Sequence, residues 1–135
     1  MFSPIEEILE DIRSGKFVIV VDDEKRENEG DLVIAAQFAD SSAINFMIKE
    51  GRGLVCVPLT KERIKELRLE PMHSKSEEDP FKTAWRVSAD AASGITTGIS
   101  AFDRARTIEV LINPKSNTQN LIKPGHIFPL EAKVC

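Results

Sequence analysis

The chain has 135 residues, of which 41% are hydrophobic and 30% are charged, and its formal net charge is -4. This length suffices for one hydrophobic core and not for two ordinary domains, so we expect residues 1–135 to form a single domain. The acidic balance, without any basic cluster, argues against a nucleic-acid surface. No apolar run approaches the roughly 20 residues that span a bilayer, and no secretory signal pattern is present, so we expect a cytoplasmic protein without membrane contact.

A helix and a strand are predicted at the start of the chain. Ser3 is placed to cap a helix with Pro4 in its first turn, and Gly15 is placed to end it. Residues 17–21 are uniformly apolar and predict a buried strand, which the acidic residues follow directly. Functional side chains often stand where a strand ends.

The middle of the chain predicts two more helices around a short strand. A helix is expected from about Ser41 to Lys49, with Asp40 as its cap. Residues 54–57 predict a buried strand that Pro58 closes, and Thr60 is placed to cap a short helix that reaches about Leu67.

The second half predicts two strands, a helix and a long polar loop. Residues 70–82 have the composition of a mobile surface loop, whereas residues 84–90 alternate between apolar and polar positions and predict a strand. Ser100 is placed to cap a helix through about Leu111, and residues 127–134 predict a final strand. Strands and helices mix without a regular βαβ repeat, which favours an α+β fold with a mixed sheet and helices packed in layers.

The stretch from Asp22 to Asp31 reads Asp-Asp-Glu-Lys-Arg-Glu-Asn-Glu-Gly-Asp, so six carboxylates crowd around one arginine. One interpretation is a solvated acidic turn. A calcium-binding EF-hand loop does not fit, because Gly30 at its sixth position would place Lys25 at the first. The other interpretation is a site where one or two carboxylates hold Mg²⁺ or Mn²⁺ while Arg26 binds an anionic group of a substrate.

Other chemically active side chains are ambiguous on the residues alone. His73 lies in the polar loop and is interpreted as a solvated surface residue, whereas His126 precedes a predicted strand and could be either packed or functional. Residues 94–98, Gly-Ile-Thr-Thr-Gly, are either an ordinary turn before a helix or a site for phosphate or sugar oxygens. Cys56 lies in an apolar run and is interpreted as a buried small residue rather than a nucleophile.

Four blocks, taken together and in order, resemble the 3,4-dihydroxy-2-butanone 4-phosphate synthase family of riboflavin biosynthesis. They are residues 22–31, residues 51–56 (Gly-Arg-Gly-Leu-Val-Cys), residues 94–100 with Asp103-Arg104, and residues 123–130 (Lys-Pro-Gly-His-Ile-Phe-Pro-Leu). The resemblance implies the same α+β class of fold. It also implies a lyase that converts D-ribulose 5-phosphate to 3,4-dihydroxy-2-butanone 4-phosphate and formate with a divalent Lewis acid and acid/base groups.

The resemblance also implies roles for individual residues. Glu27 matches a metal ligand for Mg²⁺ or Mn²⁺, Arg26, Glu27, Asp31 and Thr97 match substrate-binding positions, and His126 matches a catalytic position. Asp23 and Glu29 are close enough in sequence to serve as further acid/base groups or to tune the others. The family's threonines and histidine reach the site from the neighbouring subunit, so the resemblance implies a homodimer with shared sites.

The family's chains continue past the position of Cys135 into a segment that supplies a second metal ligand and part of the phosphate site. The resemblance therefore implies a domain that is incomplete at its C-terminus and inactive, or nearly so, by itself. The alternative is a non-catalytic domain that binds a sugar phosphate or a partner after losing that part of the site.

Overall fold

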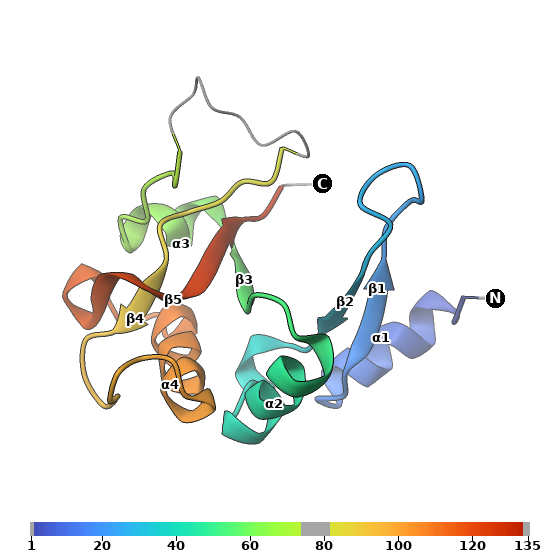
Figure 1. The fold of residues 1–135 in the computed structure, drawn as a ribbon, viewed down its shortest axis with the longest axis horizontal. Coiled ribbons are helices and arrows are strands. Elements are labelled where there is room, and N and C mark those ends of the chain that lie inside the picture. Colours follow the sequence, from blue (N-terminus) through green and yellow to red (C-terminus); the bar gives the residue numbers. More distant parts are fainter. Residues whose placement is uncertain (1, 74–81, 134–135) are drawn as a thin grey trace.

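The computed structural model describes residues 2–73 and 82–133, and Figure 1 shows their arrangement. Two sheets are present in this part of the chain: a ribbon of two strands and a sheet of three strands in the order β3-β5-β4. In the view of Figure 1, α3 (Lys61–Glu66) lies above the three-stranded sheet, and α2 (Ser41–Phe46) and α4 (Ala101–Ile112) lie below it. The mixed sheet and its helices confirm the α+β class.

Helix α1 runs from Ile5 to Arg13 and is amphipathic, but it begins one residue later than predicted. Pro4 occupies the cap position with an extended backbone, and no side chain caps the helix. The prediction of Ser3 as the cap is therefore wrong, because Ser3 lies one residue too far from the first turn to reach its free N–H groups. Gly15 follows the helix in the left-handed conformation, at φ +76°, as a residue without Cβ can do at low cost.

The ribbon pairs β1 (Val18–Val21) antiparallel with β2 (Gly30–Val33), and residues 22–29 form the loop between them. Only Val18 of β1 is buried, whereas the side chains of the other three residues are exposed. The prediction of a buried strand is therefore wrong for the described part of the chain. The apolar run indicated a strand correctly. The two-stranded ribbon is, however, separate from the three-stranded sheet, and its strand β1 contacts α1.

Two of the predicted helices form with the predicted caps. The Asp40 carboxylate accepts the N–H of Ala43 at 2.8 Å and starts α2, which continues as a π-helical turn over Met47–Gly51. Thr60 caps α3 in the same way, by accepting the N–H of Arg63 at 3.2 Å. Both caps satisfy N–H groups that a helix leaves unpaired at its start.

The three-stranded sheet positions the second half of the chain. Its central strand, β5 (Leu121–Glu131), begins earlier than predicted; it is parallel to β3 (Cys56–Leu59) and antiparallel to β4 (Ala89–Ala91). The regular strand β4 covers only the end of the predicted 84–90 segment. Strand β3 begins two residues later than predicted and includes Pro58. A proline, which lacks an N–H group, is tolerated there because β3 is an edge strand and one of its sides has no neighbouring strand to bond.

The pairing between β4 and β5 is interrupted between Ala89 and Asp90. Ala89 pairs with Ile127, but the next residue, Asp90, pairs with Ile122, so residues 123–126 bulge out of the ladder. A bulge redirects the side chains of the extra residues. The bulge of this strand contains His126.

The core lies where the three-stranded sheet meets α2, α3 and α4. Its fully buried apolar side chains include Ile44, Leu67, Ala89, Leu111 and Ile127. Among residues 2–73 and 82–133, no helix is long and apolar enough to cross a membrane. The predicted 70–82 loop falls mostly on residues 74–81, which lie outside the described residues, as does the end of the predicted 127–134 strand.

Candidate active site

The acidic loop between β1 and β2 is organised by the carboxylate of Asp22. Its Oδ2 accepts the main-chain N–H of Glu27 and a guanidinium N–H of Arg26, each at 3.0 Å, and its Oδ1 accepts the N–H of Glu29 at 3.0 Å. The N–H groups of Glu29 and Glu27 are the main cause that lowers the pKa of Asp22 below its ordinary value. Asp22 therefore stays charged and fixes the loop.

This arrangement brings Arg26 and Glu27 side by side. The Arg26 Nη2 lies 3.1 Å from the Glu27 Oε1, and both side chains keep access to solvent. Asn28 adopts the left-handed conformation, at φ 52°, which turns the chain between Glu27 and Glu29. The loop thus presents a cation and a carboxylate together, which are the groups expected to bind a phosphorylated substrate and a metal.

The other acidic residues of the prediction lie on or beside the same loop. Asp23 Oδ1 accepts the N–H of Lys25 at 2.8 Å, and Glu29 also accepts the N–H of Asp22 at its main-chain oxygen, at 3.3 Å. Asp31 lies in β2 opposite Val20 and is exposed. These three carboxylates surround the Arg26–Glu27 pair in sequence, and none of them is buried.

The donor atoms of the loop suit a hard divalent cation, because they are carboxylate oxygens with access to water. Within the described part of the chain, no group of three or more His, Cys, Asp or Glu side chains is placed to hold a metal ion. The Glu27 carboxylate has the oxygen donors that such a cation prefers, and 30% of its side chain is exposed. A site with few protein carboxylates is compatible with Mg²⁺, because this ion keeps several of its waters.

A second cluster forms at the β5 bulge. One carboxylate, that of Asp90 on β4, accepts the main-chain N–H of His126 at 2.9 Å with Oδ1 and lies 2.7 Å from the imidazole Nδ1 with Oδ2. The Asp90 side chain is 10% exposed, whereas that of His126 is 39% exposed. The carboxylate is thus buried behind a ring that still reaches solvent.

The loop of residues 94–100 is fastened beside this cluster by Asp103 of α4. Its carboxylate accepts the Thr96 hydroxyl at 2.7 Å and the N–H groups of Thr96 and Gly98, each at 3.0 Å. These bonds, led by the Thr96 hydroxyl, lower the pKa of Asp103. The predicted cap is confirmed as well, since Ser100 Oγ accepts the Asp103 N–H at 3.0 Å.

Thr96 and Thr97 have different environments. Both residues are exposed, but the Thr96 hydroxyl donates to the Asp103 carboxylate. The contact of Thr97 with a substrate stays a prediction.

The two clusters are not brought together within one chain. Figure 1 shows the acidic loop and the segment between β4 and α4 on opposite sides of the molecule. Arg26, Glu27 and Asp22 thus form one group, and His126, Asp90 and the loop that carries Thr97 form another.

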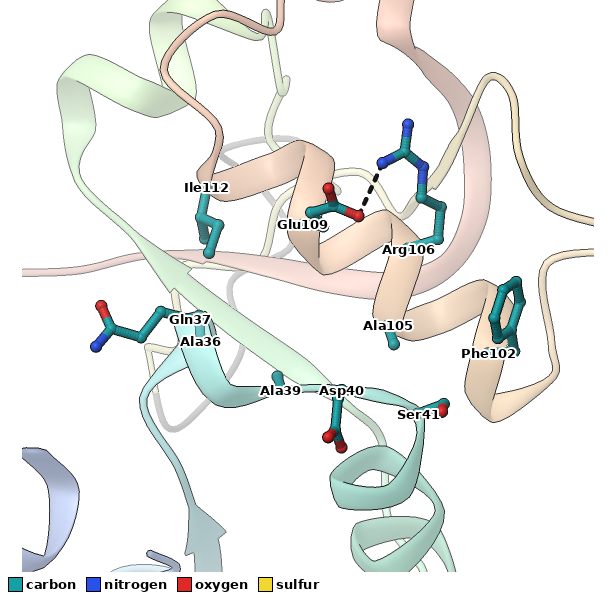
Figure 2. Close-up of a pocket in the computed structure, with 10 residues that line it drawn as sticks. All are labelled: Ala36, Gln37, Ala39, Asp40, Ser41, Phe102, Ala105, Arg106, Glu109 and Ile112. Carbon is teal, nitrogen blue, oxygen red and sulfur yellow. Dashed lines mark hydrogen bonds and ion pairs between the residues drawn. The ribbon is translucent and has the colours of Figure 1, made fainter. Parts of the chain in front are cut away.

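One pocket of the described residues is lined by other side chains. It measures about 380 Å³ and lies between the start of α2 and α4, as Figure 2 shows. Its polar lining includes the ion pair of Arg106 and Glu109, at 2.8 Å, and its rim includes the exposed Phe102. None of the predicted site residues lines it, so it is not the candidate site.

Several residues of these clusters were not predicted from the sequence. Asp22 was seen only as one of six acids, and Asp90 and Asp103 were given no role in a site. The alternation of residues 84–90 puts Asp90 on the polar face of the predicted strand, so the pattern did not indicate its burial. There was no signal for Asp22 either, because its role depends on how the loop turns.

Comparison with known proteins places this chain in a family. The family model of 3,4-dihydroxy-2-butanone 4-phosphate synthase matches residues 6–134. The chain is 56% identical over 135 residues to the riboflavin biosynthesis protein RibBA of Synechocystis sp., and 53% identical over 131 residues to the 3,4-dihydroxy-2-butanone 4-phosphate synthase of Neisseria meningitidis serogroup B. The matches cover 98% and 97% of this chain.

A solved structure agrees with these sequence matches. The crystal structure of a 3,4-dihydroxy-2-butanone 4-phosphate synthase in complex with two magnesium ions superposes with a TM-score of 0.93 at 42% identity and covers 98% of this chain. The chain belongs to the 3,4-dihydroxy-2-butanone 4-phosphate synthase family. It spans 24% and 36% of the lengths of the two curated relatives and 62% of the solved one.

Proposed function

We propose that this chain carries substrate-binding and catalytic residues of a 3,4-dihydroxy-2-butanone 4-phosphate synthase, which converts D-ribulose 5-phosphate to 3,4-dihydroxy-2-butanone 4-phosphate and formate. Membership of the family supports the reaction. The observation that carries the proposal is the acidic loop, in which Asp22 holds Arg26 and Glu27 next to each other. A phosphorylated ketose with vicinal hydroxyls needs such a pair of charges to bind.

Arg26 and four of the six acidic residues between positions 22 and 31 have roles in this proposal. Arg26 binds an anionic group of the substrate, and Asp31 accepts hydrogen bonds from its hydroxyls. Glu27 holds Mg²⁺ or Mn²⁺, and the bound cation would polarise the carbonyl and diol of the substrate. Asp23 and Glu29 supply carboxylates that accept or return protons during enolisation.

His126 and Thr97 complete the site from a second copy of the chain. The distance between the two clusters in Figure 1 supports a homodimer in which each acidic loop faces the histidine of its partner. His126 then moves a proton at its Nε2, the ring atom that Asp90 does not hold. In this proposal the chain forms a single domain and acts in the cytoplasm.

Formate release from D-ribulose 5-phosphate in the presence of Mg²⁺ tests the reaction. Glu27→Gln keeps the size of the side chain but removes the charge, so formate release is expected to be lost. Glu24→Gln is the matched control, because Glu24 is an exposed acid of the same loop, and it is expected to keep the activity of the unaltered chain. Absence of formate from the unaltered chain itself would contradict activity of these residues alone.

Mixing two inactive variants tests the shared site. Glu27→Gln and His126→Gln are each expected to be inactive, but random exchange of subunits would recreate intact sites, at about one quarter of the original number. Activity that stays absent after exchange, while the unaltered chain is active, would place both residues in the site of a single subunit.

A further inference from the structure

We propose that Asp90 is a positioning residue for His126: it fixes the imidazole as the Nδ1–H tautomer and leaves the unprotonated Nε2 facing outward. The proposal rests on the proposed function only for the catalytic use of His126. The tautomer itself is a property of the folded chain without substrate.

The hydrogen bonds of Asp90 determine which nitrogen carries the proton. An ionised carboxylate can only accept hydrogen bonds. Its Oδ2 lies 2.7 Å from the His126 Nδ1, so the neutral ring must donate from Nδ1 and keep its lone pair on Nε2. Its Oδ1 accepts the His126 main-chain N–H at 2.9 Å. Backbone and ring of the same residue are thus held by one carboxylate.

Two glycines pack closely around the Asp90–His126 pair. Gly98 lies against it so closely that a Cβ at this position would come within 2.2 Å of the Asp90 Oδ2 and 2.6 Å of the His126 Nδ1. Gly98 is held in turn by Asp103 through a 3.0 Å hydrogen bond. On the other side, the Gly125 N–H donates to Ser88 Oγ at 3.1 Å and fixes the residue before His126.

These contacts give the exposed side of the ring a defined direction. The Asp90 side chain is 10% exposed and the His126 side chain 39%, so the ring separates the carboxylate from solvent. Asp90 therefore acts on the substrate only through His126.

A purely structural Asp90 would have a different signature. In that case Asp90 would join β4 to the β5 bulge through the main-chain N–H of His126, and activity would not depend on which ring nitrogen of His126 carries the proton. Asp90→Asn separates the two cases. In this variant the asparagine side-chain oxygen must accept the main-chain N–H of His126, because that group can only donate. The asparagine NH₂ group then faces the His126 Nδ1. Since NH₂ is a donor, Nδ1 must accept, and the ring must carry its proton on Nε2.

The experiment is ¹⁵N NMR of the imidazole nitrogens in chain labelled at histidine. The chain has only two histidines, His73 and His126, so a His73→Gln variant assigns the spectrum. Above the titration range of the ring, we expect a protonated Nδ1 in the unaltered chain and a protonated Nε2 in Asp90→Asn. Ser88→Ala is the matched control, because it loosens the same junction without touching the imidazole, and it is expected to keep the Nδ1–H tautomer.

Each outcome decides the proposal. An Nε2–H tautomer in the unaltered chain would overturn it even if Asp90→Asn failed to fold, and so would a folded Asp90→Asn with an unchanged tautomer. In a chain that releases formate, Asp90→Asn is expected to lower kcat about 10²- to 10⁴-fold with a small change in KM, and to add nothing to His126→Gln. Loss of activity in the unaltered chain would affect the proposed function alone, because the NMR result needs no substrate.

Discussion

Asp22 and Glu27 are joined by a 3.0 Å hydrogen bond from the Glu27 main-chain N–H to the Asp22 Oδ2. The carboxylate that opens the acidic loop therefore positions the residue expected to bind the metal. Partners of this kind orient a ligand without contacting the ion, and their loss weakens metal affinity about 10- to 100-fold.

We expect Asp22→Asn to weaken the apparent affinity for Mg²⁺ by this factor, because the neutral amide accepts fewer hydrogen bonds and no longer attracts Arg26. The measurement is a titration of Mg²⁺ against formate release or, in an inactive chain, against thermal stability with ribulose 5-phosphate present. Glu24→Gln removes one charge from the same loop and serves as the control. Equal weakening by both variants would show that net charge, rather than the hydrogen bonds of Asp22, sets the affinity.

Asp103 makes the loop of residues 94–100 sensitive to acid. Its pKa in the fold lies below the ordinary value of 3.8, chiefly because the Thr96 hydroxyl donates to it. Because the pKa of Asp103 is lower in the folded chain than in the unfolded chain, its ionised carboxylate stabilises the fold. This stabilisation is complete at pH values above the ordinary pKa and is lost as the pH falls through the lower pKa of the folded chain. Asp103→Asn is therefore expected to be less stable at neutral pH and to lose less stability on acidification.

Denaturation midpoints in urea, measured from about pH 7 down to about pH 2, check this expectation. Glu62→Gln, at an exposed position of α3, is the control and should follow the curve of the unaltered chain. If Asp103→Asn and the unaltered chain lost stability in parallel below pH 4, the assignment of the acid sensitivity to Asp103 would be wrong.

The sequence predicted what depends on local pattern and missed what depends on contacts between distant segments. Asp40, Thr60 and Ser100 were recognised as caps because a cap bonds to an N–H only three residues away. The pairing of Asp90 with His126 joins residues 36 positions apart and requires the register of β4 on β5, including its bulge. No local signal specifies that register.

Burial was predicted least well, for the same reason. The apolar run of β1 correctly indicated a strand, but three of its four residues are exposed. Burial of a strand depends on which element covers it, and the sequence of the strand alone does not identify that element. The family resemblance supplied the candidate site residues, whereas the structure was needed to divide them into two clusters.

Gly125 is the position where the β4–β5 junction tolerates no side chain. A Cβ there would lie 2.1 Å from the main-chain carbon of Ala89, and backbone atoms of a paired strand cannot move aside. We expect Gly125→Ala to lower the free energy of unfolding by about 3 kcal/mol and to disturb the imidazole of His126. At Gly53 the nearest atom would be 4.0 Å away, so Gly53→Ala is the control and should change stability little.

Urea denaturation of the two variants measures this difference. A Gly125→Ala chain as stable as Gly53→Ala would mean that β4 and β5 are not packed as closely as the structure has them.

Cys56 is expected to resist alkylation. Burial raises the pKa of its thiol to about 11, so very little reactive thiolate exists at neutral or mildly alkaline pH. Mass spectrometry after iodoacetamide treatment of a Cys135→Ser variant checks this, with the urea-unfolded chain as the reference. Modification in the folded state as fast as in the unfolded state would contradict the raised thiol pKa of Cys56, which the structure places in a partly buried position.

Arg63 of α3 holds the end of α4. Its guanidinium, with the side chain 12% exposed, donates to the main-chain oxygens of Leu111 at 2.9 Å, Asn113 at 2.6 Å and Ser116 at 3.2 Å. The last carbonyls of a helix have no partner within it, so this one side chain satisfies groups that would otherwise compete for water. We expect Arg63→Met to lower the free energy of unfolding by about 2–3 kcal/mol.

Arg63→Lys distinguishes geometry from charge. A lysine keeps the positive charge near the end of α4 but cannot reach several oxygens at once, so it is expected to recover only part of the loss. Lys65→Met removes an exposed charge from the same helix and is the control for charge alone. Full recovery by lysine, measured by urea denaturation, would show that charge at the end of α4 matters and that the planar guanidinium does not.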